Sequence, residues 1–229
     1  MRVSALLLVL CSLSLAGGAG AAETVSIGGS RAVLLKPAQP RASVILMAGG
    51  DGEIRPGPNG TIGRLQNNEL VRTRGAYAAR GLAVLVVDAD VNLAAAVNHM
   101  RAIKPPVTVI ATSRGTLRAA RGIAKGARPD SMVLSSGFLS DASGSRENVV
   151  NILRTPERLP HTLVIEHRHD SCHNTLPAGV APFVQWAGGR ARAAWLDGGT
   201  ASGDPCKARA HHGFAGLDGQ VVSLAAGFR

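Results

Sequence analysis

The sequence predicts an α/β protein with a mostly parallel central sheet and helices on both faces. Apolar runs of about four to seven residues, too uniform for half-exposed strands, alternate along the chain with longer segments of helical character. Alternation at this spacing favours parallel strands joined by right-handed crossovers. Ligands of such sheets bind beyond the carboxyl ends of the strands, so functional residues are expected at the strand exits.

The elements follow one another along the whole chain. An N-terminal hairpin is expected at 24–27 and 32–35, around the turn residues Gly28, Gly29 and Ser30. Buried strands are expected at 42–47, 83–87, 107–111, 131–134, 162–165 and 193–196. Helices are expected at 65–80, 91–103, 116–125, 178–186 and 220–228.

The first 22 residues have the layout of a secretory signal peptide. Arg2 precedes an apolar run at 5–15, and small residues fill 16–22. The run is too short to cross a bilayer, and no later stretch reaches the roughly 20 apolar residues that a membrane span needs. We therefore expect a signal peptide at 1–22, a single domain at 23–229, a periplasmic or secreted location and no stable membrane insertion.

The charge of the chain favours no nucleic-acid partner. The formal net charge is +10, but it comes mostly from scattered arginines, and no basic run exceeds two residues. The chain has only two Trp, one Tyr and four Phe, whereas nucleic-acid surfaces interleave basic and aromatic side chains. The composition indicates at most a general affinity for anionic surfaces or acidic substrates, and it leaves the oligomeric state open.

Cys172 and Cys206 are the two cysteines outside the expected signal peptide. In an exported chain, two cysteines indicate one disulfide, because oxidising compartments let the bond form and persist. Two free thiols or a metal pair are the alternatives, but the spacing does not match a common zinc site.

Ser113 lies where a strand passes directly into a helix. Its surroundings read Ala111-Thr112-Ser113-Arg114-Gly115, with a small residue two positions before and two positions after the serine. Small flanking residues let strand and helix approach each other, so that the hydroxyl stands clear at the top of the sheet, near the positive end of the helix. The alternative is a serine that caps an ordinary strand-to-helix turn.

With this motif and its element order, the chain resembles the α/β-hydrolase superfamily, in particular its small dienelactone-hydrolase-like and carboxylesterase-like members. The usual motif is G-x-S-x-G, and Ala111 replaces its first glycine. The resemblance implies an α/β-hydrolase fold with little or no cap domain, and a catalytic triad in the order serine, acid, histidine.

The resemblance places the acid after the strand at 162–165 and the base before the last helix. Asp170 is the expected acid, with Glu166 as the alternative at the strand end itself. His212 is the expected base because it directly precedes Gly-Phe, as the catalytic histidine does in the relatives, and His211 is its alternative. A Cys172–Cys206 bond would then tie the acid loop to the base loop.

The resemblance also implies an oxyanion hole built from backbone N–H groups. One donor is expected from Arg114, the residue after the nucleophile. The other is expected from the glycine-rich turn after the strand at 42–47, at either Gly50 or Asp51.

These residues predict a serine hydrolase that cleaves carboxylic esters of small molecules through an acyl-enzyme, with no cofactor. The histidines around Asp170, which are His167, His169 and His173, lack a second convergent ligand set, so no metal site is expected. Two other readings remain open. One is a non-catalytic binding protein on the same fold, and the other is a peptidase or thioesterase that uses the same triad.

Overall fold

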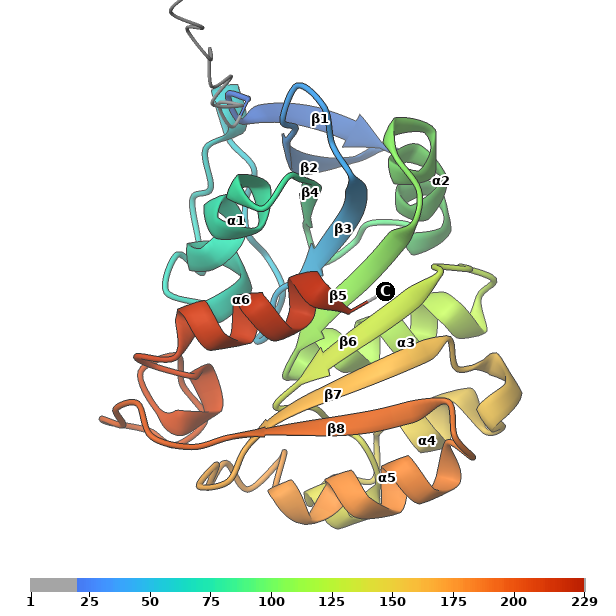
Figure 1. The fold of residues 1–229 in the computed structure, drawn as a ribbon, viewed down its shortest axis with the longest axis vertical. Coiled ribbons are helices and arrows are strands. Elements are labelled where there is room, and N and C mark those ends of the chain that lie inside the picture. The colour runs from blue at the N-terminus through green and yellow to red at the C-terminus, as the bar shows by residue number, and fades with distance from the viewer. Residues whose placement is uncertain (1–19, 229) are drawn as a thin grey trace, which may run out of the picture.

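The computed structural model describes residues 20–228, so nearly all of the expected signal peptide lies outside the described residues. One eight-stranded sheet runs through the molecule in the order β1-β2-β4-β3-β5-β6-β7-β8 (Figure 1). β1 and β2 form an antiparallel hairpin, β2 pairs antiparallel with β4, and every pairing from β4 to β8 is parallel. The predicted mostly parallel α/β architecture is confirmed.

The strands coincide with the apolar runs of the sequence. Their bounds are β1 Glu23–Ile27, β2 Ser30–Leu35, β3 Ala42–Met47, β4 Leu82–Val87, β5 Val107–Thr112, β6 Ser131–Ser135, β7 His161–His167 and β8 Ala191–Leu196. Every residue of β3, β4, β5 and β6 is buried, as expected for strands that are covered on both faces. β8 is the edge strand, and it is partly exposed.

Within residues 20–228, six α-helices cover the two faces of the sheet. Their bounds are α1 Glu69–Ala79, α2 Leu93–Ile103, α3 Arg114–Ala124, α4 Val149–Leu153, α5 Val180–Trp186 and α6 Asp218–Gly227. α1 and α6 pack on one face, and α2, α3, α4 and α5 pack on the other (Figure 1). No helix within residues 20–228 is both long and apolar enough to cross a membrane.

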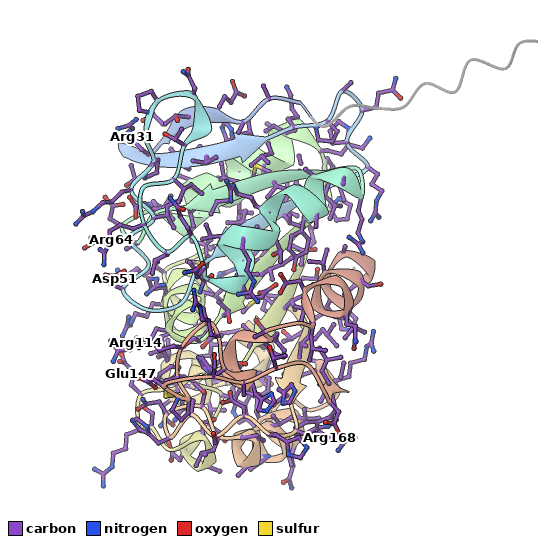
Figure 2. All side chains as sticks on the ribbon, turned by 90° about the vertical axis from the view of Figure 1, so that its left-hand side faces the viewer. Arg31, Asp51, Arg64, Arg114, Glu147 and Arg168 are labelled. Carbon is purple, nitrogen blue, oxygen red and sulfur yellow. A yellow bond between two sulfur atoms is a disulfide. The ribbon has the colours of Figure 1, made fainter. Side chains whose placement is uncertain are left out.

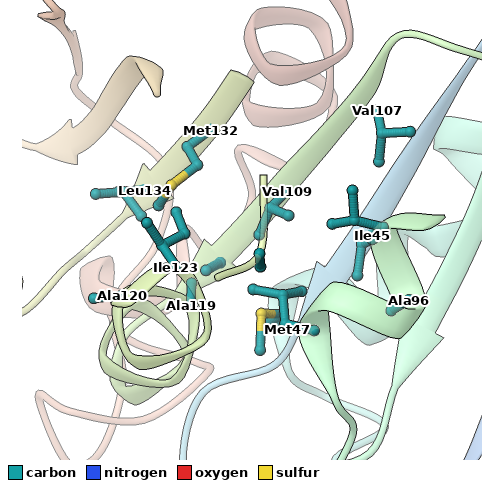
Figure 3. Close-up of a cluster of buried hydrophobic side chains, with 14 of the residues drawn as sticks. Ile45, Met47, Ala96, Val107, Val109, Ala119, Ala120, Ile123, Met132 and Leu134 are labelled. Carbon is teal, nitrogen blue, oxygen red and sulfur yellow. The ribbon is translucent and has the colours of Figure 1, made fainter. Parts of the chain in front are cut away.

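Alternating side chains of the central strands build the two cores. Ile45 and Met47 of β3 point to the face of α2 and α3, whereas Val44 and Leu46 point to the face of α1 and α6. Figure 3 shows the first of these cores, in which Ile123 of α3 and its neighbours lie against β5 and β6. Both faces of the sheet are therefore filled, and the functional residues lie at its carboxyl edge.

The structure differs from the predicted helices mainly at their ends. α1 begins at Glu69 rather than at residue 65, because Leu65 has a positive φ of 57° and the Asn68 side chain caps the helix by accepting from the Leu70 N–H at 3.2 Å. α4 was not predicted, because its five residues are too few to show a helical period. Between β6 and β7 the described chain holds only α4 and two short 3₁₀ turns, so the predicted lack of a large cap is confirmed.

The strand order places a crevice above the middle of the sheet. β3 lies between β4 and β5. The chain passes from β3 to β4 on one side of it and then crosses over to β5 on the other side. The loop after β3 and the turn after β5 therefore face each other at the point where the strand order reverses. This is where open parallel sheets bind their ligands.

Candidate active site

Ser113 lies at a strained turn between β5 and α3. Its φ of 52° and ψ of −128° are values that a residue with a side chain rarely adopts. Hydrogen bonds hold the strain in place, because the Ser113 N–H donates to the Ser135 carbonyl at 3.0 Å and Thr116 donates twice to the Ser113 carbonyl, from its N–H at 2.9 Å and from its hydroxyl at 2.7 Å. This is the geometry expected of a nucleophile elbow.

Two glycines let neighbouring chain segments approach this turn closely. A Cβ atom on Gly115 would lie 2.3 Å from the Met47 carbonyl oxygen, so α3 could not pack against the end of β3 with any other residue there. A Cβ atom on Gly49 would lie 2.9 Å from the Cβ of Ser113. The glycines of both segments therefore bring the loop after β3 next to the serine.

His212 and Asp170 form a buried pair. The distance between His212 Nδ1 and Asp170 Oδ2 is 2.9 Å, with the Asp170 side chain fully buried and the His212 side chain 6% exposed. The Thr175 hydroxyl lies 3.1 Å from the same Nδ1, and Asp170 Oδ1 accepts from the Cys172 N–H at 2.9 Å. A carboxylate at Nδ1 fixes the proton on that nitrogen and leaves Nε2 free to act as a base.

The alternatives for acid and base do not take part in this pair. Glu166 is fully buried, and within residues 20–228 its carboxylate accepts one hydrogen bond, from the His167 N–H at 3.1 Å. Burial, together with the nearby Asp170 carboxylate, holds the pKa of Glu166 well above its usual range. His211 stacks on His167, with ring centroids 4.2 Å apart, and burial lowers its pKa. Neither side chain has the contacts of the Asp170–His212 pair.

Two further side chains hold the backbone around His212. The Ser136 hydroxyl donates to the His212 carbonyl at 2.9 Å. Arg72 of α1 donates to the Gly213 carbonyl at 2.7 Å and also makes an ion pair of 2.6 Å with Asp218. The histidine loop is therefore tied to β6 and to α1.

The predicted disulfide is present. Cys172 and Cys206 are bonded, with their Cα atoms 4.6 Å apart and 34 positions apart in the sequence. Cys172 follows Asp170 by two residues, and Cys206 precedes His212 by six. The bond joins the acid loop to the base loop.

The loop after β3 turns its carbonyl groups towards Arg118 of α3. The Arg118 guanidinium donates to the Ala48 carbonyl and, at 3.1 Å, to the Gly50 carbonyl. Gly50 has a φ of 61°, which its lack of a side chain permits. Arg114 is the first residue of α3, where backbone N–H groups have no partner within the helix. Gly50, Asp51 and Arg114 therefore line one side of the cleft at Ser113.

The cleft at Ser113 consists of adjoining cavities. A cavity of about 430 Å³ is lined by Ser113 and, among others, by Gly50, Arg114, Phe138 and both cysteines of the disulfide. A smaller one of about 50 Å³ lies between Ser113, His212, Gly49 and Gly50. The serine and the histidine thus share a cavity with the backbone of the predicted oxyanion loop.

Charged side chains surround the cleft. In the view of Figure 2, Arg64, Asp51, Arg114 and Glu147 follow one another along one edge of the molecule. Asp51 is paired with Arg64 at 2.8 Å, and Glu147 is paired with Arg121. The Arg114 side chain has no carboxylate partner within residues 20–228, and it lines the cleft.

The three histidines around Asp170 each contact a different partner. His167 Nε2 lies 3.0 Å from the Gly198 carbonyl, and His169 Nε2 lies 3.4 Å from Asp197. His173 Nδ1 lies 3.8 Å from the sulfur of Cys206. In the part of the chain that the structure describes, no group of three or more His, Cys, Asp and Glu side chains is arranged to hold a metal ion.

Sequence reasoning missed four side chains that support the site: Thr175, Ser136, Arg72 and Arg118. Each acts through a contact with a segment that is distant in the sequence, or with the backbone of a loop. Thr175, five residues after Asp170, carries the nearest signal, because a hydroxyl on the acid loop is a candidate partner for the histidine. The other three have no motif that would distinguish them from ordinary helix or loop residues.

Solved structures resemble this chain over most of its length. The esterase domain of a Rhodothermus marinus protein has a TM-score of 0.60 at 14% sequence identity, over 90% of this chain and 97% of that one. TT1662 from Thermus thermophilus has a TM-score of 0.59 at 14% identity, over 91% and 98% of the two chains. The chain has the α/β-hydrolase fold.

The α/β-hydrolase fold is also found in a puromycin-hydrolyzing peptidase of Mycobacterium tuberculosis. That structure has a TM-score of 0.61 at 12% identity and covers 96% of this chain, but this chain spans only 41% of the peptidase. No protein-family model matches the chain, and no curated protein sequence does. At these identities the likeness concerns the fold, and the chemistry has to be argued from the site.

Proposed function

We propose that this protein is a serine hydrolase that cleaves carboxylic esters, with Ser113 as nucleophile, His212 as base and Asp170 as the acid of the triad. The observation that carries the proposal is the Asp170–His212 pair, which shares a cavity with a serine on a strained strand-to-helix turn. Backbone strain of this kind persists only where the surrounding structure holds it, and it is typical of functional sites, where it can present a nucleophile.

The reaction follows from these positions. The Ser113 oxygen attacks the ester carbonyl while His212 Nε2 takes its proton, and Asp170 stabilises the imidazolium that forms. The tetrahedral intermediate collapses with cleavage of the C–O bond, and the alcohol leaves with the proton from His212. Water then attacks the acyl-serine in the same way, and the carboxylic acid leaves.

Backbone N–H groups hold the oxyanion in this proposal. Arg114 supplies one, and Gly50 is favoured over Asp51 for the other, because Gly50 lines both cavities that Ser113 lines, whereas Asp51 lines only the larger one. The cleft of about 430 Å³, with no large cap above it, favours small or flexible acyl groups.

Several named neighbours are esterases, which supports ester rather than amide cleavage. The peptidase neighbour makes amide hydrolysis the second candidate. A Cys172–Cys206 disulfide supports the further proposal that the protein works in an oxidising compartment, as an exported protein would.

Labelling with a fluorophosphonate probe tests the mechanism. Residues 23–229 are purified as wild type, Ser113→Ala and His212→Ala, and hydrolysis of p-nitrophenyl acetate and of a matched p-nitroanilide is measured in parallel. We expect labelling and ester hydrolysis in the wild type alone. A folded wild type that neither reacts with the probe nor hydrolyses either substrate would instead indicate a binding protein on this fold. Faster cleavage of the anilide would indicate a peptidase.

A further inference from the structure

The loop that faces Ser113 is held by hydrogen bonds to its carbonyl groups. Arg118 donates to the carbonyls of Ala48 and Gly50, and the intervening Gly49 carbonyl accepts from the Gly52 N–H at 3.2 Å. Three consecutive carbonyl groups are therefore anchored, two of them by a single guanidinium.

Anchored carbonyls fix the direction of the amides. In a planar trans peptide, the carbonyl and the N–H of the next residue point in opposite directions. The carbonyls of Ala48 and Gly50 point to Arg118, so the N–H groups of Gly49 and Asp51 point away from it. Within residues 20–228, neither the Gly50 nor the Asp51 N–H donates a hydrogen bond to a protein acceptor. The Asp51 N–H is therefore directed by Arg118, and the Gly50 N–H by the bond between the Gly49 carbonyl and the Gly52 N–H. Both amides remain available to a ligand in the cleft that Gly50 and Asp51 line.

Arg118 is closely fitted to this loop. A Cβ atom on Gly52 would lie 2.5 Å from the Arg118 guanidinium carbon, so the loop packs directly against the planar group. The side chain is half-buried, and burial lowers the pKa of Arg118. A planar fork with several donors suits two carbonyls in a way that a lysine ammonium does not.

Arg118 also shares a rigid element with the nucleophile. α3 begins directly after Ser113, and Arg118 lies one helical turn beyond Arg114, whose N–H is the other expected oxyanion donor. One helix therefore carries one donor in its backbone and, through Arg118, fixes the loop that supplies the other.

We infer that Arg118 is a positioning residue that sets the oxyanion loop at the distance from Ser113 that the transition state requires. It acts through the Ala48 and Gly50 carbonyls and does not touch the substrate. This inference rests on the proposed hydrolase function. Its consequence is that loss of Arg118 weakens binding of the tetrahedral state much more than binding of the substrate.

The test compares Arg118→Ala, Arg118→Lys and the control Arg101→Ala. Arg101 of α2 makes an ion pair of 3.1 Å with Asp130 and donates to the Arg128 carbonyl, away from the cleft, so its variant is expected to keep wild-type kinetics within about twofold. For Arg118→Ala we expect kcat to fall about 100-fold with KM changed less than about threefold, and Ki for a trifluoromethyl ketone to rise about 100-fold. For Arg118→Lys, about a tenfold loss of kcat is expected, because one carbonyl contact is retained.

Low concentrations of guanidinium ion provide a rescue arm. They should restore kcat of Arg118→Ala severalfold and leave Ser113→Ala and Arg101→Ala unchanged. If Arg118→Ala does not fold, Arg118→Lys carries the kinetic test. An unchanged kcat, a KM that rises as much as kcat falls, or an unchanged affinity for the ketone would overturn the inference. A wild type without fluorophosphonate labelling would refute the hydrolase function itself, so the two failures are distinguishable.

Discussion

The two sides of the candidate site at Ser113 are fixed by different means. The acid and base loops, which carry Asp170 and His212, are joined by a disulfide and by several side-chain hydrogen bonds. The loop after β3 is fixed by its glycines and by Arg118. From this difference we expect the proton-transfer side to tolerate the loss of a single support, and the oxyanion side to depend mainly on the Arg118 guanidinium.

Asp170→Asn should have the largest effect, because it changes the proton-transfer chemistry itself. An amide at His212 Nδ1 favours the wrong tautomer and cannot stabilise the imidazolium, so kcat should fall roughly 1,000- to 10,000-fold. Glu166→Gln is the matched control, since burial favours the neutral form of the Glu166 carboxyl, which an amide resembles. Steady-state ester hydrolysis measures both. Equal losses in the two variants would mean that Asp170 has no special role.

Removing the disulfide tests whether the hydrogen bonds of the acid and base loops are sufficient to align Asp170 and His212. Cys172→Ser combined with Cys206→Ser should lower the free energy of unfolding by about 3 to 4 kcal/mol, from loss of a loop closure over 34 positions. The Asp170–His212 pair keeps its hydrogen bonds, so the folded variant should retain kcat within about tenfold at 25 °C. Urea denaturation and ester kinetics check the two statements. A collapse of kcat in a folded variant would show that the bond, and not the hydrogen bonds, aligns the pair.

A pH dependence of stability is expected from Glu69 of α1, which is buried and lines the small cavity between Ser113 and His212. Burial raises the pKa of Glu69 to about 7, from an ordinary value of 4.5. Between these two values the unfolded chain has lost the proton and the folded chain retains it, so the free energy of unfolding should fall as the pH rises through this window. The fall should be on the order of 3 kcal/mol.

Glu69→Gln should remove the share of this fall that Glu69 contributes, because the amide resembles the protonated acid and does not titrate. The buried Glu166, whose pKa is also raised, contributes a fall in the same direction in both proteins. Urea denaturation at pH 4.5 and pH 8 measures the difference, with the exposed Glu23→Gln as control. If the free energy of unfolding of Glu69→Gln fell with pH as steeply as that of the wild type, the pH dependence would come from another group.

Thr175→Val should have the smallest effect. It removes a hydroxyl that lies 3.1 Å from His212 Nδ1, while Asp170 remains at 2.9 Å. A loss of about 1 kcal/mol corresponds to a kcat/KM about fivefold lower. The exposed Thr200→Val serves as control. A loss as large as that of Asp170→Asn would contradict the redundancy of the acid–base side.

The fold was predictable because its strands are buried on both faces. Runs such as Val44-Ile45-Leu46 leave no polar position that would suggest an exposed face, and all the strands of the sheet coincide with such runs or with the N-terminal hairpin. The ends of the helices were harder to predict from the sequence. Leu65 lies in a left-handed turn that only the packing of the loop explains.

The candidate site was predictable where a local motif or a chain order exists. Ser113, Asp170 and His212 were predicted from an elbow motif and from the order of the triad in the fold, and the structure places Asp170 and His212 in contact. Arg118 and Ser136 could not be found in this way, because each binds a backbone carbonyl far away in the sequence, and a carbonyl has no sequence signature. The choice between Asp170 and Glu166 also needed the fold, which buries both carboxyls and places only Asp170 at the histidine.

The central claim is that Ser113 is the nucleophile of a working triad, and mapping the covalent adduct tests it most directly. The protein is treated with a fluorophosphonate, digested, and analysed by tandem mass spectrometry, with His212→Ala treated in parallel. The account predicts one phosphonylated residue, Ser113, in the wild type, and little or none in His212→Ala. An adduct on another serine such as Ser136, or no adduct on a folded wild-type protein, would contradict it.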